Sequence, residues 1–165
     1  MEYLLTLKIL RSMDDIQIRE ATLTDLPVLL KFQQGVVDYE RPYDPTIAPD
    51  PVSYYDLKDL ILDSEVVVLV AVSENRLIGC GLGMEKEGRR YLNHKTYAYL
   101  GLMYTDPDFR GMGVNAKIIE ALKQWALSKG LYEMRLTVYS DNISAIKAYE
   151  KTGFKKHIIE MRLAE

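Results

Sequence analysis

One stretch of the chain, Thr105 to Ala116, constrains the fold more than any other. It reads Thr-Asp-Pro-Asp-Phe-Arg-Gly-Met-Gly-Val-Asn-Ala and connects an extended run, Tyr97 to Tyr104, to a helical run, Val114 to Lys129. Two glycines and an arginine therefore lie where a helix begins, at backbone N–H groups that have no intrahelical partner and at the positive end of the helix dipole. Such a strand-to-helix junction is suited to phosphate. The sequence predicts a site for a phosphate-bearing ligand.

The spacing of this loop excludes two common phosphate binders. Ala116 stands where the dinucleotide fingerprint needs a third glycine after Gly111-x-Gly113, and the chain has no Gly-Lys-Ser/Thr for a P-loop. The pattern that remains is Arg110-x-x-Gly113-x-Asn115, preceded by Asp106-Pro107. A glycine-rich turn without a ligand is the alternative interpretation of these residues.

This loop resembles the pyrophosphate loop of the GNAT superfamily of acyl-CoA N-acyltransferases, Gln/Arg-x-x-Gly-x-Gly/Ala, from which Asn115 departs at the last position. A second segment resembles the other signature of that family, Asn-x-x-Ala-x-x-x-Tyr-x-x-x-Gly-Phe. The matching residues are Asn142, Ala145, Tyr149, Gly153 and Phe154. Because both segments occur, and in the family's order, the chain is identified as a member of the superfamily over roughly Ile16 to Leu163.

Length and composition agree with one α/β domain. The chain has 165 residues, of which 48% are apolar, enough for one packed core and too few for two ordinary ones. We expect a single GNAT-like domain at residues 13–165, with a mixed, largely antiparallel twisted sheet flanked by helices. Residues 1–12 are expected to be an N-terminal extension or a mis-assigned start, because the apolar run is too short to span a bilayer and has no small-residue cleavage signature.

Local patterns predict the elements of this domain. Alternation and apolar runs favour strands, proline clusters favour irregular loops, and Thr24 or Asp25 is expected to cap the first helix. The expected elements are a strand at Ile16–Arg19, a helix towards Tyr39, a loop at Arg41–Pro51, a helix from Ser53 to about Asp63, a strand at Val66–Val72 covered on both faces, a strand at Leu77–Met84, and a half-buried strand at Tyr132–Val138.

Composition also narrows the function. A net charge of −3 without a basic block argues against nucleic acid as the main partner, and no membrane partner is expected. One cysteine, Cys80, cannot form an internal disulfide, so the cytoplasm is the expected location, and its apolar, glycine-rich surroundings favour a core residue over a nucleophile. With two histidines and no Cys/His cluster, no metal site is expected.

The resemblance implies acetyl-CoA as co-substrate and assigns residues to it. Arg110 and the backbone of the loop would hold the pyrophosphate, and the backbone of Met103 and Thr105 would pair with the pantetheine amides. Asn142 would hydrogen-bond the cofactor, although it is equally suited to capping a helix. The implied cofactor-binding residues are Met103, Thr105, Arg110, Gly111, Met112, Gly113, Val114, Asn115 and Asn142.

The chemistry of an amine acceptor sets the catalytic requirements. An alkyl amine is almost entirely protonated at pH 7, and forming its neutral form costs roughly 4–5 kcal/mol. The thioester is already activated, so no enzyme nucleophile is needed. By resemblance Tyr149 would be the general acid that protonates the coenzyme A thiolate; the alternative is a core aromatic beside Ala145 and Ile146.

The resemblance assigns no general base. The glutamate common in the family falls on or near Tyr99, and the run from Tyr97 to Thr105 contains no acid. Ordered water, Glu40, Glu85 or His94 remain as alternatives.

The acceptor is expected to meet the segment after the first helix. Three acids and two tyrosines there are suited to a cation, although surface acids are more often simply solvated. These residues are Asp38, Tyr39, Glu40, Tyr43 and Asp44.

The sequence therefore predicts an N-acetyltransferase that acts on a primary amine by direct attack in a ternary complex. A small-molecule acceptor is preferred over a protein or peptide amine, and a homodimer is possible. A non-catalytic acyl-CoA sensor is the alternative from another class.

Overall fold

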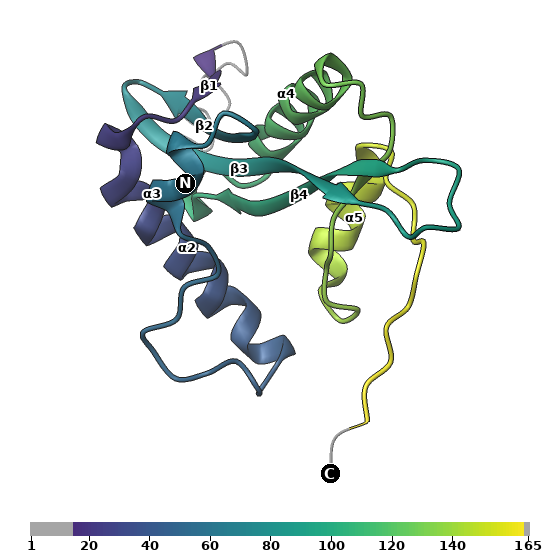
Figure 1. Ribbon diagram of the computed structural model, residues 1–165. Coiled ribbons are helices and arrows are strands. Elements are labelled where there is room, and N and C mark those ends of the chain that lie inside the picture. Colours follow the sequence, from purple (N-terminus) through teal and green to yellow (C-terminus); the bar gives the residue numbers. More distant parts are fainter. Residues whose placement is uncertain (1–14, 164–165) are drawn as a thin grey trace.

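The computed structural model describes residues 15–163, so the predicted extension at residues 1–12 lies outside the described residues. The chain runs from one strand through two helices to three consecutive strands, and then through a helix and a short strand to a last helix (Figure 1). The elements are β1 (Gln17–Glu20), the 3-10 turn η2 (Leu23–Asp25), α2 (Leu26–Glu40), η3 (Arg41–Tyr43), α3 (Leu57–Leu62), β2 (Val66–Ser73), β3 (Arg76–Glu87), β4 (Thr96–Thr105), η4 (Pro107–Phe109), α4 (Val114–Ser128), β5 (Met134–Arg135) and α5 (Ile143–Lys151).

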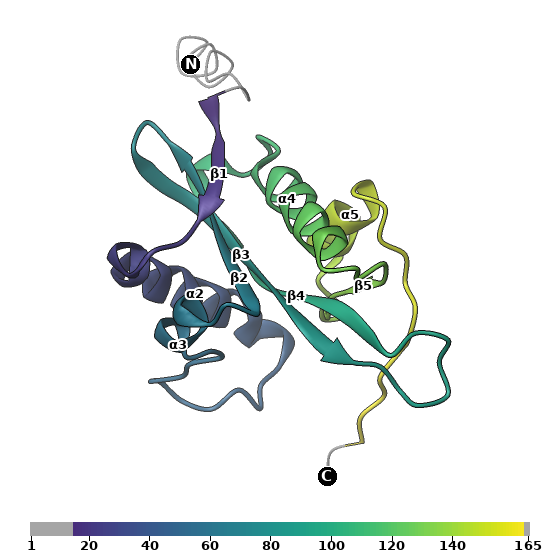
Figure 2. The same cartoon turned by 45° about the horizontal axis from the view of Figure 1, so that its top comes forward.

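The strands form one five-stranded sheet in the order β1-β2-β3-β4-β5. The first three pairings are antiparallel, and β4 pairs with β5 in parallel. Figure 2 shows the sheet nearly edge-on, with α2 and α3 against one face and α4 and α5 on the other. The predicted fold class, α/β with a mixed and largely antiparallel sheet flanked by helices, is confirmed.

Strand β2 is covered on both faces, which explains its continuous apolar run. Val67 and Leu69 belong to the core beneath α4, together with Ile118, whereas Val68 and Val70 belong to the core beneath α2 and α3. Alternate residues of a strand point to opposite faces, so each face needs its own apolar set.

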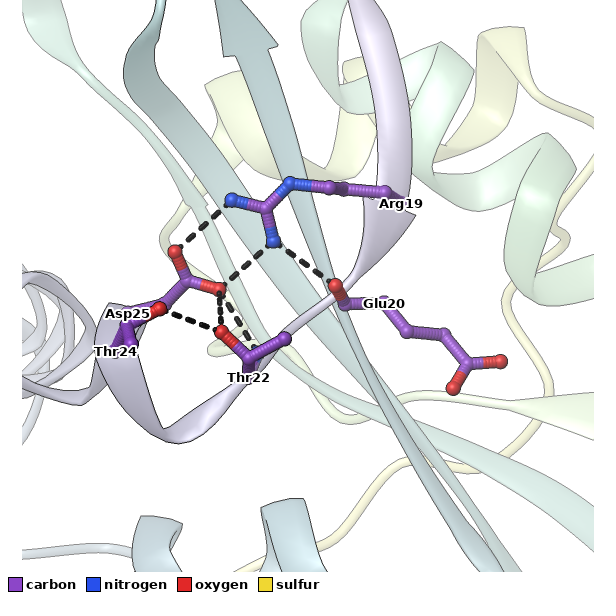
Figure 3. A network of polar contacts seen from close by, with 5 residues as sticks. All are labelled: Arg19, Glu20, Thr22, Thr24 and Asp25. Carbon is purple, nitrogen blue, oxygen red and sulfur yellow. Dashed lines mark hydrogen bonds and ion pairs between the residues drawn. The ribbon is translucent and has the colours of Figure 1, made fainter.

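A bidentate ion pair connects β1 to the beginning of α2 (Figure 3). The Arg19 guanidinium donates to both carboxylate oxygens of Asp25, at 2.8 and 2.9 Å, and the Thr22 backbone N–H donates to the same carboxylate at 2.8 Å. Asp25 precedes the helix as expected, but its side chain does not cap it, because its carboxylate is engaged by Arg19 and Thr22.

The second helix is shorter than predicted. It begins at Leu57 rather than at Ser53, with Asp56 accepting from the Asp59 backbone at 3.2 Å. The buried side chain of Gln33 explains the difference, because it donates to the Ser53 hydroxyl and accepts from the Tyr55 backbone N–H, each at 2.9 Å. These bonds hold the preceding residues in an irregular conformation.

The predicted strand at Tyr132–Val138 is wrong in its extent. Only Met134 and Arg135 form β5, paired with Ala98 and Tyr99, and Tyr132 is 84% exposed. An alternating sequence forms a strand only where a neighbouring strand lies alongside it. β4 pairs with this segment over two residues, and the two strands then separate. That separation opens the edge of β4 beside the predicted cofactor residues.

Candidate functional site

The loop before α4 presents unpaired backbone N–H groups. Gly111 and Gly113 both have left-handed backbone angles, with φ of 77° and 78°, a conformation that side chains with a Cβ rarely adopt. The first helical hydrogen bond is donated by Lys117 N to Gly113 O at 3.1 Å. Among the described residues the N–H groups of Gly113, Val114 and Asn115 therefore have no backbone acceptor, as an anion site requires.

The side chains of this loop separate into core and surface residues. Val114 is buried, so only its backbone is available to a ligand, whereas Met112 packs its half-buried side chain on the same core and donates its N–H to the Phe109 carbonyl at 3.4 Å. Asn115 is half-buried in the first turn of α4. The loop itself is braced by Asp106, which accepts from Asp108 N at 3.0 Å and from Arg76 at 2.6 Å.

Arg110 lies on the exposed side of the loop. Its Nε donates to the Thr105 carbonyl at 3.4 Å, and its guanidinium carbon lies 5.3 Å from the centre of the Tyr39 ring. It forms no ion pair with a described acid, which leaves its charge available to an anion. Its position between the loop and α2 fits the predicted contact with phosphate.

The edge of β4 is open where the cofactor is expected. Asp106 N donates to Ile78 O on β3 at 2.8 Å. Because the backbone N–H and C=O groups of successive strand residues point to alternate sides, those of Met103 and Thr105 point away from β3, towards the edge that faces β5. On that edge β5 pairs only as far as Tyr99. The predicted backbone contacts of Met103 and Thr105 are therefore sterically available to an extended ligand.

An irregularity in β4 marks the same place. Leu102 is a buried residue with φ of 50°, and the register between β3 and β4 shifts between Cys80 and Leu82. A left-handed leucine is costly, and such strain is concentrated at functional sites. No sequence signal identifies it, because only the neighbouring Gly101 is typical of an irregular strand.

Asn142 begins α5. It is 6% exposed, and its Oδ1 accepts from Ala145 N at 3.2 Å and from the Ser144 hydroxyl at 3.3 Å. The structure thus confirms the capping role of its oxygen. A cofactor contact would use the Nδ2 group, for which the described residues offer no hydrogen bond.

Tyr149 is a half-buried residue near the end of α5. Its ring makes an edge-to-face contact with Phe154, with ring centres 6.1 Å apart. Burial above all, and then the nearby Glu40 carboxylate and Tyr99, raise the pKa of Tyr149 to about 12. The phenol is therefore protonated at pH 7, as a proton donor must be, and no described residue hydrogen-bonds it.

Tyrosines converge on Glu40, the last residue of α2. Burial raises the pKa of Glu40, partly offset by the Tyr54 side chain that faces it. Glu40 in turn helps to raise the pKa of tyrosines from three other segments, although for each of them burial is the larger cause. They are Tyr54 and Tyr55 before α3, Tyr139 after β5, and Tyr149 in α5.

Two contacts hold these segments together. The Tyr39 hydroxyl lies 3.2 Å from the Ser144 hydroxyl and joins the end of α2 to the beginning of α5. The rings of Tyr43 and Tyr139 stack with centres 6.1 Å apart. The predicted acceptor segment therefore lies beside the helix that carries Tyr149.

Sequence reasoning missed Tyr54, Tyr55 and the residue that positions them, Gln33. Tyr55 also packs its hydroxyl against Gly101 of β4, where a Cβ would collide with it. The only signal in the sequence was a glutamine on the apolar face of a helix, next to Phe32.

The other acids near the acceptor segment are engaged elsewhere. Asp44 forms a bidentate ion pair with Arg162, at 3.0 and 3.2 Å, and this contact above all lowers its pKa. Asp38 accepts from Gln34 at 2.7 Å. His94 lies in the hairpin between β3 and β4, where its Nε2 is 3.0 Å from a guanidinium nitrogen of Arg135 in β5. Glu85 is exposed. Glu40 is the candidate base whose charge acts on Tyr149.

Cys80 is fully buried, and its thiol donates to the Leu102 carbonyl at 3.4 Å. Burial raises its pKa, which makes it a poor nucleophile. Within residues 15–163 no three His, Cys, Asp or Glu side chains are grouped as a metal would need, and no helix there is long and apolar enough to cross a membrane.

Curated relatives of this chain are acetyltransferases. Thialysine N-epsilon-acetyltransferase from Sus scrofa is 26% identical over 159 residues, which cover 86% of this chain and 85% of that protein. The enzyme of the same name from Bos taurus is 34% identical over 70 residues, which cover 40% of this chain and 41% of that protein.

Solved structures share the fold. A predicted acetyltransferase from Clostridium acetobutylicum, solved with acetyl-CoA, superposes with a TM-score of 0.70 at 18% identity, over 90% of this chain and 96% of that one. Aminoglycoside N-acetyltransferase AAC(6')-Iy in complex with CoA has a TM-score of 0.68 at 18% identity, over 90% of this chain and 99% of that one.

The family model described as Acetyltransferase (GNAT) family matches residues 34–154, which include both segments recognised in the sequence. The chain therefore belongs to the acetyltransferase (GNAT) family, and by that membership it is an acetyl-CoA-dependent N-acetyltransferase.

Proposed function

We propose that the protein moves the acetyl group of acetyl-CoA to a primary amine of a small molecule, by direct attack in a ternary complex. The observation that carries the proposal is the edge of β4 beyond Tyr99, which β5 does not cover. The bare N–H groups of the α4 N-terminus follow this strand in the chain, and the protonated Tyr149 is near Tyr99. The names of the relatives from Sus scrofa and Bos taurus, which act on thialysine, support an amine acceptor.

The residues present fit acetyl-CoA in three places. The N–H groups of the loop Gly111 to Asn115, apart from that of Met112, which donates to the Phe109 carbonyl at 3.4 Å, would hold the pyrophosphate together with the Arg110 guanidinium. The backbone of Met103 and Thr105 would pair with the pantetheine amides along the edge of β4. Asn142 would add a contact through its amide nitrogen.

Direct attack is supported by the burial of the cysteine and by the thioester, which is already activated and needs no enzyme nucleophile. Cys80 lies inside the sheet with a raised pKa. Tyr149 would give its proton to sulfur as the C–S bond breaks, so that coenzyme A leaves as a thiol.

The proposal is tested by incubating the full chain with acetyl-CoA and a broad panel of primary amines, and by measuring released thiol. Thiol release that depends on a small amine is the expected result. Acetylation of peptides alone would favour a protein or peptide acceptor instead.

A non-catalytic acyl-CoA sensor is the second candidate function. It is favoured by Tyr99, which occupies the strand position where the family's glutamate is expected. Tight acetyl-CoA binding without transfer to any amine or peptide would favour the sensor. A homodimer and a cytoplasmic location are further parts of the proposal, to be checked by light scattering and by cell fractionation.

A further inference from the structure

We infer that Glu40 is the proton acceptor for the amine, and that it lies across the reaction site from Tyr149. This inference rests on the proposed function and adds to it the missing base and the charge of the acceptor. It places the base on α2 rather than on β4, so that the acid and the base come from elements on opposite faces of the sheet.

The first argument is the position of Glu40. It ends α2 next to Tyr39, which is joined to the N-terminus of α5 at Ser144. Tyr54 and Tyr55 approach from the loop that Gln33 holds in place. Glu40 is thus half-buried at a point where the acceptor segment, the loop before α3 and α5 meet.

The second argument is elimination among the acids of the acceptor segment. Asp44 is neutralised by Arg162 and also accepts from the Thr46 hydroxyl at 2.6 Å. Asp38 is exposed and faces Gln34. Glu40 has no ion pair with any basic residue of the described chain, so its charge is available to an incoming ammonium group.

The third argument is the surroundings of Glu40. The titratable groups facing it are the phenols of Tyr54, Tyr55, Tyr139 and Tyr149, none of which is charged at neutral pH, because the pKa of each lies above its ordinary value. The neighbouring Arg41 is occupied by Asp50 at 2.6 Å and by the Ala48 carbonyl at 2.9 Å. A carboxylate among neutral aromatic rings attracts a cation, and burial makes it a stronger base.

The proton balance is complete with these two residues. The ammonium group gives one proton to a Glu40 oxygen, and the neutral nitrogen then forms the C–N bond with the thioester carbon. When the C–S bond breaks, Tyr149 protonates sulfur. The nitrogen loses its second proton, which restores the phenol, and Glu40 releases the first proton to solvent.

The test compares Glu40→Gln with wild type across pH, using the best amine of the panel and saturating acetyl-CoA. We expect kcat/KM at pH 7 to fall about a hundredfold, the low end for general base catalysis. The deficit should shrink to about tenfold or less near pH 10, where roughly a quarter of the free amine is already neutral. The acid limb of the wild-type profile, which reports the raised pKa of Glu40, should disappear.

Glu120→Gln is the matched control, because Glu120 is exposed on α4 and its carboxylate accepts from Gln124 at 2.8 Å. It should behave as wild type at every pH. Unchanged acetyl-CoA affinity and an unchanged thermal melt of Glu40→Gln would show that the site is intact.

Two outcomes overturn the inference. A change in kcat/KM below threefold at pH 7 would mean that another group or water takes the proton. A loss confined to KM and constant with pH would mean that Glu40 holds the cation without removing its proton. If wild type releases no thiol with any amine, the proposed function itself fails, which is a distinguishable result.

Discussion

At the scale of single residues, burial raises the pKa of both the proposed acid and the proposed base, and their different ordinary pKa values keep one protonated and the other ionised at neutral pH. The pKa of Tyr149 is raised, so its proton stays available for sulfur, and the pKa of Glu40 is raised, so its carboxylate is a stronger base. Desolvation is the larger cause for both groups, and it disfavours the charged form of each. One environment therefore prepares two opposite proton transfers.

Replacing Tyr149 by phenylalanine tests the acid. The ring and its contact with Phe154 remain, so acetyl-CoA affinity should barely change, while turnover should fall by about ten- to a thousandfold. Because the pKa of Tyr149 is about 12, the phenol should not itself lower activity below about pH 11. Turnover within twofold of wild type, where chemistry limits the rate, would make Tyr149 a packing residue.

Replacing Asn115 by aspartate tests the phosphate site. A negative charge in the first turn of α4 should stabilise the free protein by about 0.3–1 kcal/mol through the helix dipole. The same charge should repel the pyrophosphate and weaken acetyl-CoA binding at least tenfold, as titration calorimetry would measure. Asn93→Asp in the β3–β4 hairpin adds the same charge away from α4 and should leave binding unchanged. Equal acetyl-CoA affinities of the two variants would mean that the pyrophosphate does not bind at the α4 N-terminus.

Gly113 is a less clean test of the same site. Its φ of 78° means that valine would strain the turn whether or not phosphate lies there. Loss of binding in such a variant would confuse backbone strain with a steric collision. Asn115 has no left-handed angle and avoids this difficulty.

At the scale of elements, an ion pair holds β1 to the beginning of α2. Asp25 is 5% exposed, and Arg19 above all lowers its pKa to about 2. A carboxylate with a lowered pKa stabilises the fold above its unfolded pKa of about 3.9, and the stabilisation is lost as pH falls through the folded value. The pair therefore contributes fully at neutral pH and progressively less from about pH 4 to pH 2.

Asp25→Asn measures this contribution. The shift in pKa predicts a loss of about 2 kcal/mol in the free energy of unfolding at pH 7. No charge is stranded in the interior, because the Arg19 side chain is 45% exposed. Urea unfolding should show a smaller difference between the two proteins at pH 3 than at pH 7. A difference that does not depend on pH would mean that packing, rather than ionisation, makes Asp25 important.

At the scale of the whole molecule, the last described segment runs along the outside of the domain (Figure 1). Its apolar side chains Ile158, Ile159, Met161 and Leu163 are 60–92% exposed. Its contact with the body includes the ion pair between Arg162 and Asp44, beside the acceptor segment.

Ending the chain after His157 should therefore cost little stability. Exposed side chains bury almost no apolar area, and an ion pair at the surface contributes at most about 1 kcal/mol. We expect the melting temperature to fall by about 2–4 °C or less, measured by circular dichroism at low protein concentration. A fall above about 8 °C would show that these side chains are packed in solution.

The sequence by itself determined most of the elements and the family, and it predicted the cofactor side of the site. The loop at Arg110–Asn115 and the segment at Asn142–Phe154 depend on backbone conformation and spacing, and both are local properties. The apolar run of β2 likewise predicted burial on both faces of that strand, because successive residues of a strand point to opposite faces.

Only the tertiary structure decided the acceptor side. Glu40 differs from Asp44 in its partners. Asp44 is paired with Arg162, which lies more than a hundred positions away in the sequence, so the sequence alone does not show which acid is neutralised. Gln33 shortens α3 through contacts across twenty residues, and β5 stops where β4 ceases to run beside it. Burial and pairing determine pKa values and strand ends, and both arise only when distant segments meet.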